Sequence, residues 1–208
     1  VVQTLDNLVP TVAITIRIYD FWNQIEPNPP DSALAHNTWG SRSGTHTYFW
    51  DHPDKIVDEA RKRGLEVYLN VIWPPGWANG GSKTCNPYVG DDLSCGNVIT
   101  NPLWYEDFFY NLVAHFQGRV VYFGVWNEPN DRHCFNGPSD DTYLKVFMDM
   151  YALPARRAML TANPSAKLVG PELSMGTGVP RGGRNRWLTA RLWRRSWGWA
   201  CCRTGRPR

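Results

Sequence analysis

The sequence contains no run of about 18 consecutive apolar residues, so we expect no membrane-spanning helix and no membrane partner. Its first residues lack a basic segment followed by an apolar stretch and so do not resemble a signal peptide, although the chain also has no initial Met. The five cysteines are odd in number and scattered, with no Cys-x-x-Cys pair and no histidine cluster. That pattern excludes a disulfide framework and gives no indication of a metal site.

Two of the cysteines, Cys85 and Cys95, flank a loop rich in Gly, Asn, Pro and Asp. Either these two cysteines form a disulfide that closes the loop, or both are free thiols. A disulfide indicates an oxidising compartment. The sequence therefore leaves the location open, with a secreted or periplasmic one favoured.

Lysine and acidic residues are absent from residues 178–208, which contain nine arginines. The rest of the chain carries 13 basic and 19 acidic side chains, a net charge of −6, although the whole chain is at +3. Residues 177–208 resemble an out-of-frame translation or a cloning scar, with a natural basic extension as the alternative. Residues 1–176 form the expected domain, and they contain no basic stripe interleaved with aromatic residues, so we expect no nucleic-acid partner.

Four apolar runs rich in β-branched residues predict four strands. Their nearly continuous apolar character is typical of strands that are covered on both faces, as in a parallel sheet. The runs are residues 13–19, 65–72, 120–126 and 166–170.

Helical patterns lie between these runs. Asp51 and Asn101 are the expected caps of the first two helices, which Gly64 and Gly118 should end. A third helix is expected over residues 140–162, where an internal Pro should kink or split it. Strands that alternate with helices predict an α/β fold, a partial TIM (β/α) barrel of about four parallel strands.

One carboxylate has a position suited to acid/base chemistry. Glu128 directly follows the third apolar run, at the carboxyl end of a strand, and precedes Pro129 on a stiff turn that Trp126 partly shields. A shielded carboxyl can stay protonated and donate its proton, and the amide of the neighbouring Asn127 can bind a hydroxyl group. The alternative is an ordinary helix-capping Asn-Glu-Pro turn.

The interpretation of Glu128 as an acid/base residue is strengthened by four segments that resemble consecutive strands of one known fold. Residues 16–27, 65–77, 120–130 and 163–171 resemble strands two to five of the clan of retaining glycoside hydrolases with (β/α)8 barrels, and most of all family 39, which includes β-xylosidases. The resemblance implies that Glu128 is the general acid/base, that Asn127 contacts the sugar 2-hydroxyl, and that Arg17 lies near the nucleophile. For Arg17 the alternative is a structural pair with a carboxylate such as Asp20. The implied substrates are β-linked sugars, with β-xylosides first and β-glucosides second, and no cofactor or metal is implied.

The chain departs from the family pattern at the second carboxylate. The family places its nucleophile at the end of strand seven, and neither this segment nor the first strand has a match here. Glu172 is the nearest substitute in the sequence, with Asp20 and Glu26 as others, and a surface or salt-bridged carboxylate is the alternative. Exposed edges of half a barrel favour homo-oligomers. Because the nucleophile segment has no match, two alternatives to catalysis stay open. They are a half-barrel that binds carbohydrate without turnover and a truncated relic.

The loops are rich in aromatic residues, which can pack against the apolar faces of sugar rings. Ordinary loop packing is the alternative for each of them. The candidates for substrate contact are Trp22, Trp73, Trp77 and Trp126.

Overall fold

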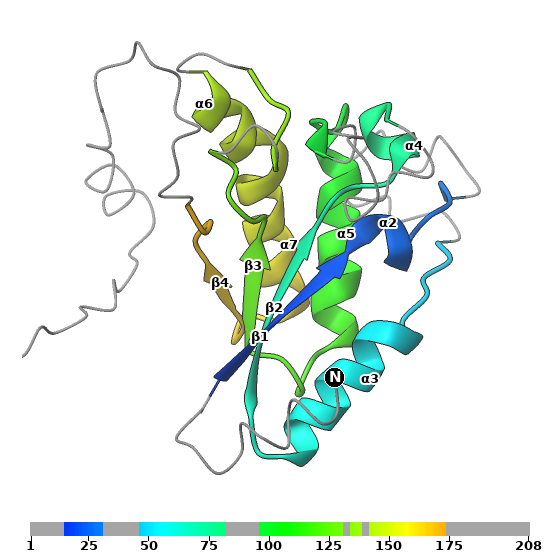
Figure 1. Cartoon of the computed structure of the whole chain (residues 1–208), viewed down its shortest axis with the longest axis vertical. Helices are drawn as coiled ribbons and strands as arrows, with labels where there is room; N and C mark the ends of the chain where they lie inside the picture. The colour runs from blue at the N-terminus through cyan, green and yellow to red at the C-terminus, as the bar shows by residue number, and fades with distance from the viewer. Residues whose placement is uncertain (1–14, 31–45, 82–95, 131–133, 139–141, 174–208) are drawn as a thin grey trace, which may run out of the picture. The chain divides into compact units, whose positions relative to one another are not determined.

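The computed structural model describes residues 15–30, 46–81, 96–130, 134–138 and 142–173 (Figure 1). The chain separates into two units, Val1–Gly178 and Val179–Arg208, and every described residue belongs to the first. The expected boundary at residue 176, the Arg-rich tail and the Cys85–Cys95 pair lie outside the described residues and stay predictions. Among the residues that are described, no helix is long and apolar enough to cross a bilayer.

Four parallel strands form a single sheet in the order β1-β2-β3-β4, which is also their order along the chain. Consecutive parallel strands joined by helices are the repeating units of an α/β barrel. The predicted fold class, a partial (β/α) barrel of four strands, is therefore confirmed. The strands are β1 (Thr15–Phe21), β2 (Glu66–Ile72), β3 (Tyr122–Val125) and β4 (Lys167–Val169).

Long helices separate the strands, and short helices occupy the connections that follow β1, β2 and β3. Helices α5 and α7 pack against each other behind the sheet in Figure 1. The long helices are α3 (Asp51–Lys62), α5 (Pro102–His115) and α7 (Leu153–Ala162), and the short ones are α2 (Trp22–Ile25), α4 (Gly76–Asn79) and α6 (Tyr143–Phe147).

Three of the four expected helix boundaries are confirmed. The side chain of Asn101 accepts a hydrogen bond from the N–H of Leu103, and Gly64 and Gly118 follow their helices with φ of 74° and 80°. The expected cap at Asp51 is wrong. Asp51 is instead the first residue of α3, where its charge favours the positive end of the helix dipole without capping it.

The third helical segment is interrupted as expected. Between α6 and α7 lies a π-helix, η3 (Met148–Ala152), and Pro154 is the second residue of α7. Pro154 has no N–H to donate to the carbonyl four residues earlier, so a regular α-helical turn lacks one hydrogen bond there. A wider turn before the proline is a common solution.

The two faces of the sheet differ in character. Ile18, Leu69 and Phe123 are in register and buried against the helices, together with aromatic residues such as Phe108 and Tyr151. Because side chains alternate along a strand, the residues between them point to the other face. That face, the inner one of a closed barrel, carries Arg17, Tyr19, Tyr68, Asn70, Tyr122 and Gly124.

Candidate functional site at the carboxyl ends of the strands

The structure brings Glu128 and Glu172 to the same edge of the sheet, just beyond β3 and β4. The N–H of Glu128 donates to the carbonyl oxygen of Glu172 at 2.7 Å, and Asn127 forms an isolated parallel bridge with Glu172. Both glutamates are half-buried. This edge is the one at which α/β barrels build their active sites.

Two side chains of β1 reach Glu172. Arg17 Nη1 forms an ion pair with Glu172 Oε2 at 2.6 Å. Tyr19 Oη lies 2.5 Å from the same carboxylate oxygen and 2.8 Å from Asn127 Oδ1. The carboxylate that pairs with Arg17 is therefore Glu172 and not Asp20, and a place of Arg17 near a nucleophile stays a prediction.

The Tyr19 hydroxyl stays protonated because its surroundings raise its pKa well above the ordinary value. Burial is the largest cause, followed by the hydrogen bond and the charge of Glu172, while Arg17 acts in the opposite direction. The charge of Glu128 also raises the pKa of Tyr19. The Tyr19 hydroxyl is therefore close enough to both glutamates for their charges to act on it.

The backbone is strained where β2 and β3 end. Trp73 and Trp126, each the first residue after its strand, have φ of 54° and 68°, and Glu128 has φ of 48°. Positive φ is uncommon for residues other than glycine and costs about 1–3 kcal/mol. Each turned tryptophan has its carbonyl bound, that of Trp73 by the N–H of Asn23 at 3.0 Å and that of Trp126 by Asn70 Nδ2 at 3.0 Å. The bond from Asn70 helps to hold the turn after β3 that carries Glu128.

A close-packed layer of polar groups lies beneath the Glu128 turn. A Cβ added to Gly124 would lie 2.5 Å from the hydroxyl of Tyr68 and 2.7 Å from Cγ of Asn70. Asn70 is fully buried, and burial together with the charge of Glu172 raises the pKa of the Tyr68 hydroxyl. Only a glycine leaves room for these two polar side chains at this point.

A cysteine links the two residues of the predicted acid/base motif. Cys134 Sγ lies 3.8 Å from Glu128 Oε2 and 4.0 Å from Asn127 Nδ2. The carbonyl of Cys134 accepts a hydrogen bond from Trp126 Nε1 at 3.0 Å. Cys134 therefore lies against the turn that carries Asn127 and Glu128.

Sequence reasoning missed Tyr19, Tyr68, Asn70 and Cys134. For Tyr19 a signal existed, because it lies two residues after Arg17 on the same strand and so shares its face. Tyr68 and Asn70 repeat that spacing on the next strand. Cys134 follows Glu128 by only six residues, but this spacing does not by itself predict their contact.

The predicted substrate-binding tryptophans separate into two groups. Trp22 and Trp126 are each 1% exposed, so neither offers a face to a sugar, and these two predictions are corrected. Trp22 stacks on Phe108 in the core, with ring centroids 4.8 Å apart, because α2 turns it inward directly after β1. Trp73 and Trp77 are half-buried. Trp73 stacks on Phe21 at 4.8 Å at the end of β2, and its contact with substrate stays a prediction.

The other two carboxylates considered from the sequence lie away from Glu128. Asp20 points to the opposite face of β1 from Tyr19, accepts a hydrogen bond from the N–H of Phe21, and faces His52 at 3.4 Å. Burial raises the pKa of Asp20, an effect that these two partners oppose.

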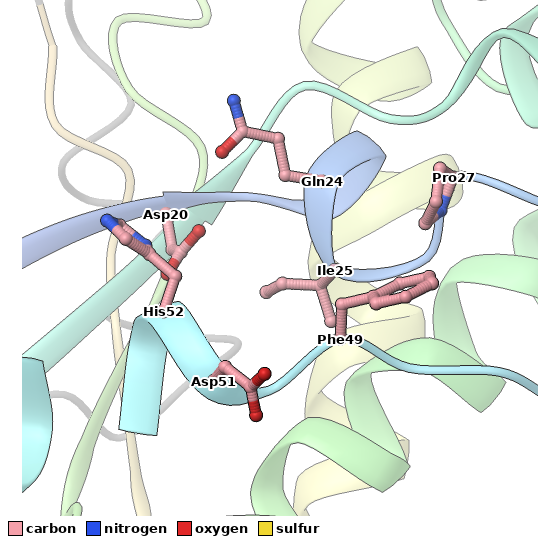
Figure 2. A pocket seen from close by; sticks show the side chains of 7 residues that line it. All are labelled: Asp20, Gln24, Ile25, Pro27, Phe49, Asp51 and His52. Carbon is pink, nitrogen blue, oxygen red and sulfur yellow. The ribbon is translucent and has the colours of Figure 1, made fainter. Parts of the chain in front are cut away.

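Asp20 lines a pocket of about 410 Å³ at the end of β1, which Figure 2 shows with its labelled side chains. The pocket contains none of the residues around Glu128. Its lining consists of Asp20, Gln24, Ile25, Pro27, Phe49, Asp51 and His52.

Glu26 is buried in a separate cluster. Its carboxylate accepts a hydrogen bond from Trp22 Nε1 at 2.8 Å and pairs with His46 Nδ1 at 2.5 Å. Burial raises the pKa of Glu26, although both partners act against that rise. In the part of the chain that is described, no group of three or more His, Cys, Asp and Glu side chains has an arrangement suited to a metal ion.

Comparisons with known proteins agree with this architecture. No protein-family model matches the chain. Over 142 residues, which are 67% of this chain and 12% of the relative, the sequence is 26% identical to the endo-1,4-β-xylanase A of Thermotoga neapolitana.

Two solved structures match the fold with a TM-score of 0.55 each. The monomeric β-xylosidase of Caulobacter crescentus CB15 is 18% identical, and the match covers 82% of this chain and 32% of that one. The GH39 enzyme of Xanthomonas axonopodis pv. citri is 19% identical, and the match covers 85% of this chain and 33% of that one. The expected resemblance to glycoside hydrolases of family 39 is thus confirmed at the level of the fold, and the chain spans about a third of the length of these structures.

Proposed function

We propose that this chain is part of a retaining glycoside hydrolase for β-linked sugars, with Glu128 as the general acid/base. The observation that carries the proposal is the place of Glu128, on a strained turn directly after β3 and beside a second carboxylate. Glycoside hydrolysis requires one carboxyl group that protonates the leaving oxygen and another carboxylate close to it.

The neighbouring residues suit the binding of a sugar. Asn127 has its oxygen occupied by Tyr19, so its Nδ2 group is the one oriented by the site to donate to a sugar 2-hydroxyl. A bond of this kind strengthens in the transition state. Trp73, half-buried at the end of β2, packs against an apolar sugar face in this proposal. β-Xylosides are the first substrates to test and β-glucosides the second, because the similar proteins above include a xylanase and a β-xylosidase.

Hydrolysis of aryl β-xylosides and β-glucosides by the parent chain and by Glu128→Gln tests the assignment. We expect Glu128→Gln to lower the rate about 10²- to 10⁴-fold for a poor leaving group, because that substrate needs the proton, and far less for dinitrophenyl glycosides. Glu66→Gln is the matched control, because Glu66 begins β2 at the other end of the strands. Equal activity of the parent and Glu128→Gln on the poor leaving group contradicts the assignment.

The binding of sugars without turnover is a second function for this site, which offers the Asn127 amide and the half-buried Trp73 as contacts for a sugar. Titration of xylo-oligosaccharides against tryptophan fluorescence distinguishes the two functions, because the binding function predicts saturable binding by a chain that hydrolyses nothing. A folded chain that neither binds nor hydrolyses these sugars contradicts both.

A further inference from the structure

Trp126 connects the hydrophobic core to the turn that carries Glu128. It precedes Glu128 by two residues, has φ of 68° and is buried. Its indole Nε1 donates to the carbonyl of Cys134 at 3.0 Å. A buried indole has few ways to rotate, because its ring is packed and its single donor needs a partner. The direction in which the chain leaves Trp126 toward Glu128 is therefore coupled to the place of the Cys134 carbonyl.

An aromatic residue of the π-helix packs against this indole. Tyr151 belongs to η3 and is fully buried, and its ring centroid lies 4.9 Å from that of Trp126. Phe135 contacts both rings, at 5.5 Å from Trp126 and 5.9 Å from Tyr151. Single π-turns inside helices are frequent at functional sites. Here the wider turn carries the tyrosine that reaches the residue before the acid/base motif.

The hydroxyl of Tyr151 binds a different part of the chain, the connection between α4 and α5. The N–H of Ile99 donates to Tyr151 Oη at 2.9 Å, and this hydroxyl donates to the carbonyl of Asn97 at 3.4 Å. Ile99 is 2% exposed, so solvent does not replace the hydroxyl as its partner. Loss of the hydroxyl leaves a buried N–H unpaired, and the connection has to move to satisfy it.

The same connection holds the segment around Cys134. The N–H of Asn136 donates to the carbonyl of Gly96, and Asn136 Nδ2 donates to Asn97 Oδ1, each at 2.7 Å. The two loops are closely packed, because a Cβ added to Gly96 would lie 3.0 Å from the carbonyl oxygen of Cys134. A shift of the connection therefore displaces the carbonyl that binds the indole of Trp126.

We propose that Tyr151 is a positioning residue for the general acid/base, an inference that rests on the function proposed above. Its hydroxyl acts on Glu128 through residues 96–99, the Cys134 carbonyl and the Trp126 indole. Proton donation requires the carboxyl group to lie within hydrogen-bond reach of the leaving oxygen, so a small displacement of Glu128 slows that step. Steps that need no proton are much less affected.

The dependence of the rate on the leaving group tests this role. Tyr151→Phe removes the hydroxyl and keeps the ring that contacts Trp126. We expect kcat/KM to fall about 10-fold for phenyl β-xyloside, which needs the proton, and less than about 2-fold for dinitrophenyl β-xyloside. An equal loss on both substrates shows a general structural defect and overturns the proposal.

Tyr105→Phe is the matched control. Tyr105 is buried beside Tyr151, with ring centroids 5.0 Å apart, but among the described residues its hydroxyl has no hydrogen-bond partner. Its removal should leave the ratio of the two kcat/KM values at that of the parent chain. A change of this ratio that is as large in Tyr105→Phe as in Tyr151→Phe also overturns the proposal.

Hydrogen exchange of the Trp126 indole N–H, followed by NMR, tests the coupling without a substrate. We expect exchange at least about 10-fold faster in Tyr151→Phe than in the parent chain, because a looser Cys134 carbonyl lets the bond open more often. Tyr105→Phe should exchange at the rate of the parent. Equal exchange in all three folded proteins contradicts the inferred coupling.

The outcomes separate this inference from the proposed function. If Glu128→Gln loses activity on phenyl β-xyloside while Tyr151→Phe keeps it, Tyr151 has no positioning role and the glycosidase proposal stands. A parent chain that hydrolyses none of the tested glycosides overturns the proposed function, and with it the role of Tyr151 in the reaction.

Discussion

Replacing Gly124 with alanine tests how closely the groups beneath the Glu128 turn are packed. The new Cβ would lie 2.5 Å from the Tyr68 hydroxyl, 2.7 Å from Cγ of Asn70 and 2.8 Å from its Oδ1. Asn70 cannot move aside freely, because it is fully buried and its Nδ2 group binds the carbonyl of Trp126. The methyl group therefore displaces either the tyrosine ring or the amide that holds the strained turn.

The expected loss of stability combines two opposing effects. Overpacking of this kind costs about 1–3 kcal/mol. Alanine returns about 0.4–1 kcal/mol, because it restricts the unfolded chain and the φ of Gly124 is not in the left-handed region. We expect the free energy of unfolding to fall by about 1–2 kcal/mol. Hydrolysis should suffer more, about 100-fold, because a shift of the Trp126 carbonyl moves Glu128 out of position.

Urea unfolding and the initial rate of aryl β-xyloside hydrolysis measure the two effects. Gly64→Ala is the matched control: its Cβ meets nothing within 4 Å but its φ is 74°, so it should lose stability through strain and keep full activity. Adding Tyr68→Phe to Gly124→Ala removes the nearest atom and should recover part of the stability. If Gly124→Ala matches the parent in stability and shows no coupling with Tyr68→Phe, the inferred close packing is wrong.

Four further predictions concern other parts of the fold. Arg157→Ala should lower the free energy of unfolding by about 2–3 kcal/mol in urea, because the buried Glu106 carboxylate loses its bidentate partner; a loss below about 0.5 kcal/mol contradicts this. Asn101→Ala should cost about 1 kcal/mol by removing the cap of α5, whereas replacement by Asp or Ser should cost little. Burial acts to lower the pKa of His46, but its hydrogen bond to Glu26 and the nearby negative charges outweigh burial and raise that pKa. The stabilisation from protonated His46 is complete below about pH 6.5 and is lost as the pH rises through the raised pKa, so His46→Gln should flatten the decline in stability above about pH 6.5. Among the described residues β1 and β4 are the outer strands of the sheet, and we propose that the chain self-associates through them, which light scattering at increasing protein concentration measures; a strictly monomeric chain contradicts this.

The strands and helix ends could be predicted because they depend on local sequence. Apolar β-branched runs locate all four strands, with ends that differ by two residues or fewer, and Asn101 carries the side chain that its cap requires. The cap at Asp51 failed because capping needs an extended backbone at the residue before the helix. Trp50 occupies that position with φ of −87° and ψ of −9°, which is a helical conformation. Residue type alone does not report that geometry.

The site could be predicted only where a residue's role follows from its place on a strand. Asn127 and Glu128 come just after Trp126, the first residue beyond β3, so their position at the carboxyl edge could be predicted from the sequence. Trp22 and Trp73 follow β1 and β2 in the same way, yet Trp22 enters a helix and is buried while Trp73 has positive φ and stays half-buried. The difference depends on which neighbours bind the backbone after each strand, and those neighbours are distant in sequence. The contact between β1 and Glu172 has the same origin, since it depends on the curvature of the whole sheet, so the sequence names Glu172 as a candidate without indicating its partners Arg17 and Tyr19.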